Sequence, residues 1–158
     1  MTKIDDVLLE LNRSVNTYMK SIPIFQYNNA PYRLIDNYSA SPYVRCDVCG
    51  CYPVTVVSVL EGSDSRKLRL CNQCIDILAG QRISECFNVF RAKRQNILFN
   101  RKLIDQLSLM LDDNIHTDTN LQLKKSEFKD LQKILKHLCD GQNLTSSQIQ
   151  LVDNYLQA

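Results

Sequence analysis

The first part of the chain spaces its apolar residues as an amphipathic helix does. They recur roughly every 3.6 positions between residues 3 and 20, and Pro23 follows shortly after. The apolar positions are Ile4, Val7, Leu8, Leu11, Val15 and Tyr18. Residues 22–45 follow no clear period and contain three prolines and four tyrosines. Residues 1–45 are therefore predicted to be a helix and an irregular connection, with aromatic rings packed around the next segment.

The middle of the chain has the pattern of a β-hairpin followed by a helix. Residues 54–60 are rich in valine, residues 61–65 contain turn-forming Gly, Ser and Asp, and residues 67–70 alternate polar with apolar. Apolar positions then take helical spacing from Ile75 to Phe90. We expect residues 46–95 to form one module, with a bend in its long helix near Gly80 or Asn96.

The last part of the chain, residues 96–158, is predicted to be helical. An apolar stripe extends to Leu111, and residues 114–124 are polar enough to form a hinge. A second stripe occupies residues 126–138. Thr145 and Gln148 then have the spacing of a capping box before a final helix. The predicted fold class is mainly α with a small β-hairpin, flanked by an N-terminal helix and a C-terminal helical bundle or hairpin.

Composition supports a folded chain without a membrane span. Hydrophobic residues make up 44% and charged residues 23% of the 158 positions. No apolar run reaches the roughly 18 residues that a membrane helix needs. Asp5, Asp6 and Glu10 interrupt the apolar stretch at the N-terminus, which is atypical of a secretory signal. We expect an intracellular protein of the nucleus or cytoplasm.

Four of the seven cysteines have the spacing of a zinc site. Two Cys-x2-Cys pairs, Cys46 with Cys49 and Cys71 with Cys74, are separated by 21 residues. Two such pairs predict a tetrahedral site of four thiolates that binds one zinc ion. A closed site of this kind leaves no position for water or substrate, so the metal is expected to be structural. Cys51 remains an alternative ligand to Cys49.

The order of knuckle, hairpin and helix is that of a treble-clef finger. Cys46-x2-Cys49-Gly50 and Leu70-Cys71-Asn72-x-Cys74 resemble the GATA-type zinc finger, over residues 46–80 only. The resemblance implies a treble-clef C4 zinc module with the four cysteines as ligands. The chain has no Trp, and Ile75-Asp76-Ile77 follow the last cysteine in place of Gly-Leu-Tyr. The family's base-contacting residues are therefore not carried over.

Positive charge is concentrated in and after this module. Nine basic and two acidic residues lie between positions 66 and 102, while the segments before and after carry net charges of −2 and −3. Such asymmetry suggests either an anionic partner or a solvated helix face that pairs with acidic residues of the flanking segments. The residues expected to contact phosphates of DNA or RNA are Arg66, Lys67, Arg69, Arg82, Arg91, Lys93 and Arg94.

These observations favour a zinc-finger nucleic-acid-binding protein, a transcription-type regulator with a structural zinc ion. The alternative is an assembly protein in which the zinc module is a staple and the amphipathic helices bind a protein partner or a second copy. We do not expect an enzyme, because the sequence has no phosphate-binding loop, nucleophile elbow or His-Glu-x-x-His motif. His116 and His137 lie in polar settings and are expected at the surface.

Overall fold

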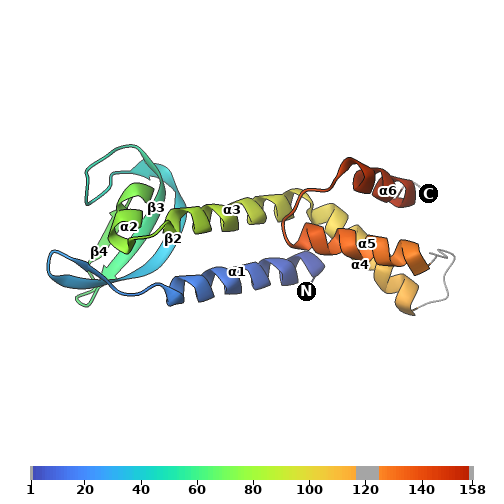
Figure 1. The fold of residues 1–158 in the computed structure, drawn as a ribbon, viewed down its shortest axis with the longest axis horizontal. Helices are drawn as coiled ribbons and strands as arrows, with labels where there is room; N and C mark the ends of the chain where they lie inside the picture. Colours follow the sequence, from blue (N-terminus) through green and yellow to red (C-terminus); the bar gives the residue numbers. More distant parts are fainter. Residues whose placement is uncertain (1, 117–124, 157–158) are drawn as a thin grey trace. The chain divides into compact units, whose positions relative to one another are not determined.

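Six helices and a four-stranded antiparallel sheet make up the part of the chain that the structure, a computed structural model, describes: residues 2–116 and 125–156 (Figure 1). Strands follow one another in the sheet in chain order, β1-β2-β3-β4. The strands are β1 Phe25–Tyr27, β2 Ala30–Val44, β3 Val54–Gly62 and β4 Lys67–Leu70. The helices are α1 Lys3–Ser21, α2 Asn72–Ala79, α3 Ile83–Phe99, α4 Arg101–His116, α5 Lys125–Cys139 and α6 Ser146–Leu156.

The chain divides into two compact units. The first, here called the sheet unit, is Asn12–Phe90 and holds all four strands and α2. The second, here called the helical unit, combines Met1–Leu11 with Arg91–Ala158. Helices α1 and α3 each contribute residues to both units. No helix in the described residues is both long enough and apolar enough to cross a bilayer.

The prediction of an irregular connection over residues 22–45 is wrong, because most of it is strand. Tyr32 and Leu34 are buried and alternate with exposed neighbours, which is the period of a half-buried strand. Pro42 falls in the register irregularity between Ser39 and Val44, where β2 has no regular pairing with β3 to lose. The sheet is therefore larger than the predicted hairpin, although β3 and β4 form that hairpin with the predicted turn.

The core of the sheet unit lies where the sheet packs against α2 and the start of α3. Its fully buried side chains come from strands and helices alike, and they include Val57, Leu60, Leu70, Ile75 and Ile83. Tyr18 of α1 adds edge-to-face packing on Phe87, with ring centroids 5.5 Å apart. Burial and contact with the Cys86 side chain raise the pKa of Tyr18 to about 12.

The predicted bend in the long helix is a complete break at Gly80. Gly80 adopts a left-handed conformation, with φ of 67°, and ends α2. Asp76 then accepts hydrogen bonds from the backbone N–H and the hydroxyl of Ser84, at 2.8 and 2.5 Å. These bonds satisfy donors at the start of α3. A second break separates α3 from α4 at Asn100, four residues after Asn96.

The two predicted C-terminal helices are found as α5 and α6. The capping box is present: Thr145 N–H donates to Gln148 Oε1 at 2.9 Å, and Gln148 N–H donates to Thr145 Oγ1 at 3.2 Å. Helix α5 packs on α4, and residues of α4, α5 and α6 share a core that includes Ile104, Leu107, Leu131, Ile134, Leu138 and Val152. Most of the expected hinge at 114–124 lies outside the described residues, and α4 extends to His116.

Gly141 is the position in the helical unit where the absence of a side chain matters most. Its φ is +74°, and a Cβ there would lie 2.7 Å from Lys93 Cα. Its carbonyl also accepts a hydrogen bond from Asn96 Nδ2 at 2.8 Å.

We expect Gly141→Ala to destabilise the helical unit by about 2–4 kcal/mol, because backbone strain adds to overpacking. Gly80→Ala is the matched control: φ is +67° but nothing lies within 4 Å of the added Cβ, so only the strain of about 1–2 kcal/mol applies. Urea denaturation followed by circular dichroism measures both. Equal losses would contradict the close approach of α3 to Gly141.

Candidate metal centre

The first cysteine pair sits in a tight turn directly after β2. Gly50 N–H donates to the Cys46 carbonyl at 3.0 Å, and Cys46 N–H donates to the Cys51 carbonyl at 3.0 Å. Gly50 has a φ of +75°, which a residue without Cβ adopts at low cost. These two hydrogen bonds close the turn and hold the side chains of Cys46 and Cys49 near each other.

Asp47 joins this turn to β4. Its N–H donates to the carbonyl of Arg69 at 2.8 Å, and its carboxylate accepts the N–H of Arg69 at 2.7 Å. Asp47 therefore forms hydrogen bonds with both the N–H and the carbonyl of Arg69. Since Cys71 follows β4 directly, this contact brings the two cysteine pairs together. This role of Asp47 was not predicted from the sequence, where its position inside the Cys-x2-Cys turn was the available signal.

The second cysteine pair lies at the start of α2. Cys71 occupies the N-cap position, and Cys74 lies in the first helical turn. Ile75 N–H donates to the Cys71 carbonyl at 3.1 Å, which begins the helix. The positive end of the helix dipole and its free N–H groups favour negative sulfur at this end.

The four sulfurs have the separations that a single metal ion requires. All four Sγ atoms lie within 4.8 Å of one another. The Cys49 and Cys71 sulfurs are 3.8 Å apart. A tetrahedral site with metal–sulfur bonds of about 2.3 Å places its sulfurs about 3.8 Å apart. The predicted ligands Cys46, Cys49, Cys71 and Cys74 are therefore brought together and could hold a metal ion.

Hydrogen bonds bias two of these thiols toward the thiolate form. Burial acts to raise the pKa of Cys46, but N–H groups of Cys49, Cys71 and Val48 outweigh it, so the pKa is lowered. The backbone N–H of Cys51 is the main cause that lowers the pKa of Cys49 to about 6. Burial raises the pKa of Cys74. A bound cation deprotonates coordinating thiols outright, so all four can serve as ligands.

Cys51 is not part of the group. The four mutually close sulfurs include Cys49 and exclude Cys51, whose side chain is exposed. Its side-chain contact with Cys49 is the main cause that raises its pKa to about 12. Of the remaining thiols, Cys139 is half-buried and Cys86 is exposed. His137 is exposed as predicted, and the side chain of His116 lies outside the described part.

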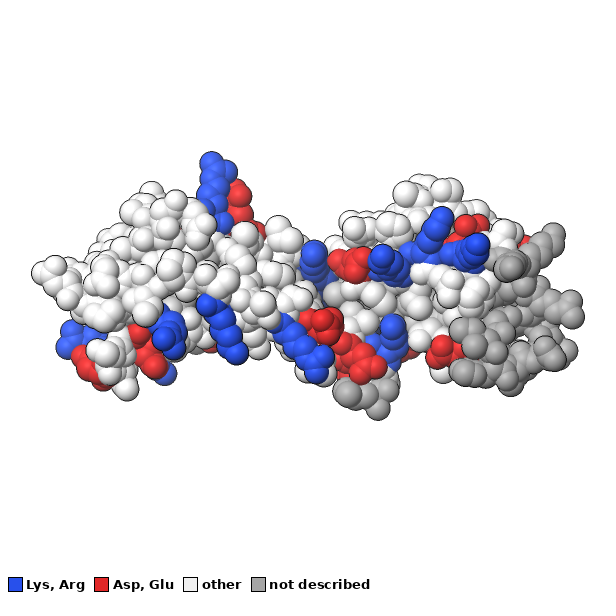
Figure 2. Space-filling view, turned by 60° about the horizontal axis from the view of Figure 1, so that its bottom comes forward, with Lys and Arg blue, Asp and Glu red and all other residues white. Residues whose placement is uncertain are grey.

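The seven basic residues predicted to contact nucleic acid do not all belong to the same compact unit. Arg66, Lys67, Arg69 and Arg82 belong to the sheet unit, and Arg91, Lys93 and Arg94 to the helical unit. On the face drawn in Figure 2, Lys and Arg lie singly or in short rows with Asp and Glu among them.

The local settings of the seven basic side chains also differ. Arg66 is 3.7 Å from Asp64, and Arg82 is 3.1 Å from Glu85. Arg91 is half-buried, and burial lowers the pKa of its guanidinium. The other four side chains are exposed, and within the described chain no ion pair is found for Lys67, Arg69, Lys93 or Arg94.

Comparison with known proteins adds no relative. Searches with family models, against curated proteins and against solved structures found no match to this chain.

We expect Cys46→Ser to lose the metal, because three thiolates and a hydroxyl form a much poorer site. Cys51→Ser is the matched control and should keep one ion per chain. Metal content of the purified variants measures the ion, and substitution by Co²⁺ reports tetrahedral thiolate ligation through its absorption spectrum. Loss of metal from Cys51→Ser with retention in Cys49→Ser would overturn the assignment of the four ligands.

Proposed function

We propose that the protein is a zinc-dependent nucleic-acid-binding protein of the transcription-regulator type. In this proposal Cys46, Cys49, Cys71 and Cys74 bind one Zn²⁺ as a structural ion. An all-thiolate tetrahedral donor set is the kind that Zn²⁺ occupies in structural sites. With four protein ligands the ion has no open position for substrate, so its role is to fix the fold around it.

The order of the elements supports a treble-clef assignment for residues 46–80. The knuckle is followed by the β3–β4 hairpin and then by α2, which carries Cys71 and Cys74 at its start. Beyond β3–β4 the sheet continues into β2 and β1, which enlarges the support of the module. The similarity to the GATA type is limited to this order and to the ligands.

One observation carries the nucleic-acid proposal: the metal knuckle is hydrogen-bonded directly to the basic strand. Asp47, which lies inside the Cys46–Cys49 turn, forms hydrogen bonds with both the N–H and the carbonyl of Arg69. The backbone of the strand that carries the exposed side chains of Lys67 and Arg69 is therefore joined to the cysteine turn. Cations held on a rigid strand and without an acidic partner are suited to contact phosphates.

We expect the double change Lys67→Glu with Arg69→Glu to abolish binding of mixed-sequence nucleic acid at low salt. Each phosphate contact contributes roughly 0.7–0.9 to the slope of log K against log salt, so the wild type should also show a steep dependence. Lys93→Glu with Arg94→Glu is the matched control from the helical unit. Fluorescence anisotropy over a salt series measures both variants. If only the Lys93 and Arg94 changes impair binding, the sheet unit is not the interface.

A second function, in assembly, is favoured by the surface of the helical unit. Phe99 is 88% exposed and Leu109 is 66% exposed. Exposed apolar surface marks contact sites where it is contiguous, and these two are the most exposed large apolar side chains among the described residues of the helical unit. If this surface joins two copies, sedimentation velocity should show a concentration-dependent dimer that Phe99→Asp abolishes; a monomer at all concentrations would exclude self-assembly.

A further inference from the structure

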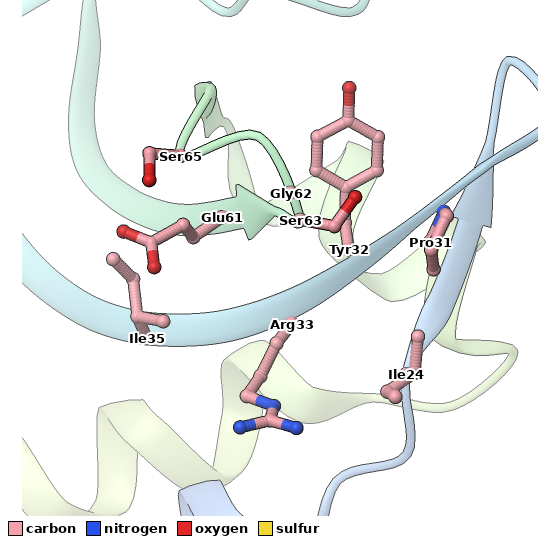
Figure 3. A pocket seen from close by; sticks show the side chains of 9 residues that line it. All are labelled: Ile24, Pro31, Tyr32, Arg33, Ile35, Glu61, Gly62, Ser63 and Ser65. Atoms are coloured by element: carbon pink, nitrogen blue, oxygen red, sulfur yellow. The ribbon is translucent and has the colours of Figure 1, made fainter.

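Two adjoining hollows lie on the outer face of the sheet. They could not be predicted from the sequence because strand β2, which lines part of both, was not predicted. The first has a volume of about 400 Å³ and is lined by Ile35, Asp36, Tyr38, Val59, Lys67 and Arg69. The second, of about 360 Å³, lies toward the β3–β4 turn and shares Ile35 with the first (Figure 3). Figure 3 shows Ile35 and Glu61 on one side of this second hollow, with Arg33 extending away from the turn.

Strand register explains why these side chains share a face. Asp36 is paired with Val59, and Val59 with Arg69, which gives one row across three strands. Lys67 lies two positions before Arg69 on β4, and alternate residues of a strand point to the same side. Tyr38 follows Asp36 by two positions and extends the face along β2.

The first hollow combines an aromatic wall with two cations. Tyr38 is 37% exposed, so part of its ring is open to solvent. Lys67 and Arg69 have exposed side chains and form no ion pair within the described residues. Aromatic rings beside unpaired cations are the means by which proteins bind single strands, because every base has a face that stacks and every nucleotide a phosphate.

We propose that this face binds single-stranded nucleic acid, with a base stacked on Tyr38 and adjacent phosphates held by Lys67 and Arg69. The inference rests on the proposed function and names its ligand. A hollow of about 400 Å³ has room for a nucleoside. A duplex keeps its bases stacked inside and offers only phosphates to such a surface, so Tyr38 selects the unpaired strand.

Asp36 adds a preference among bases. Its carboxylate accepts the N–H of Asn37 at 2.8 Å, which leaves further acceptor positions facing the hollow. A carboxylate accepts hydrogen bonds from the exocyclic amino group of cytosine but has no donor to meet in uracil or thymine at that position. The face therefore prefers cytosine to uracil or thymine.

The test uses the zinc-loaded full chain and labelled 12-nucleotide oligo(C) and oligo(U) RNA, oligo(dC) and oligo(dT) DNA, and a mixed-sequence DNA duplex. We expect the C strands to bind at least tenfold more tightly than the duplex, and more tightly than the U or T strands. Comparison of the RNA and DNA arms identifies the natural strand. Tyr38→Leu should weaken single-strand binding about tenfold, whereas Tyr38→Phe keeps the stacking ring and most of the affinity. Asp36→Ala should remove the preference for C.

The outcomes separate this inference from the proposed function. If Lys67→Glu with Arg69→Glu abolishes binding but Tyr38→Leu does not change it, the nucleic-acid proposal stands and the stacking site is refuted. Equal affinity for the duplex and the single strands refutes the inference in the same way. If none of the nucleic acids binds at low salt, both proposals fail. Circular dichroism of Tyr38→Leu and Tyr38→Phe confirms that each variant is folded before binding is compared.

Discussion

The reciprocal hydrogen bonding of Asp47 and Arg69 is the contact on which the proposed link between the metal site and the basic strand depends. It joins the turn after β2 to β4, the strand that precedes Cys71. Arg69 lies 22 residues after Asp47 in the chain. A second contact lies beside it: Cys71 N–H donates to Cys46 Sγ at 3.4 Å and also joins the two cysteine pairs. The Asp47–Arg69 contact helps to hold the four sulfurs at separations that suit one ion. A bound ion would in turn hold β4 in place.

This arrangement links the metal site to the surface chemistry proposed for the sheet. The backbone of Arg69 faces the knuckle, while its side chain lines the outer hollow beside Tyr38 and Lys67. The metal therefore does no chemistry in this account. In the proposed function, a bound ion would fix the register of the basic strand, and the strand would present its cations in a constant arrangement to a polyanion.

Short-range patterns predicted the parts of the molecule that depend on neighbours in sequence. The Cys-x2-Cys spacings identified the four sulfurs, and the Thr145–Gln148 spacing identified the last helix start. Strand β2 was missed because Pro31 and Pro42 masked the alternation of Tyr32 and Leu34. The Asp47–Arg69 contact and the hollow at Tyr38 arise from strand pairing, which local periodicity does not encode. The basic segment is continuous in sequence, yet its residues belong to two units.

Hydrogen–deuterium exchange of the Asp47 and Arg69 amides, with and without a zinc chelator, tests the link between metal and strand most directly. The account predicts that both amides are protected in the metal-bound protein and exchange rapidly once the metal is removed. Amides of α4 around Ile104 and Leu107, in the helical unit, should keep their protection and serve as the internal reference. If Arg69 stays protected without metal, the strand is held by the sheet alone and the metal does not organise the basic surface.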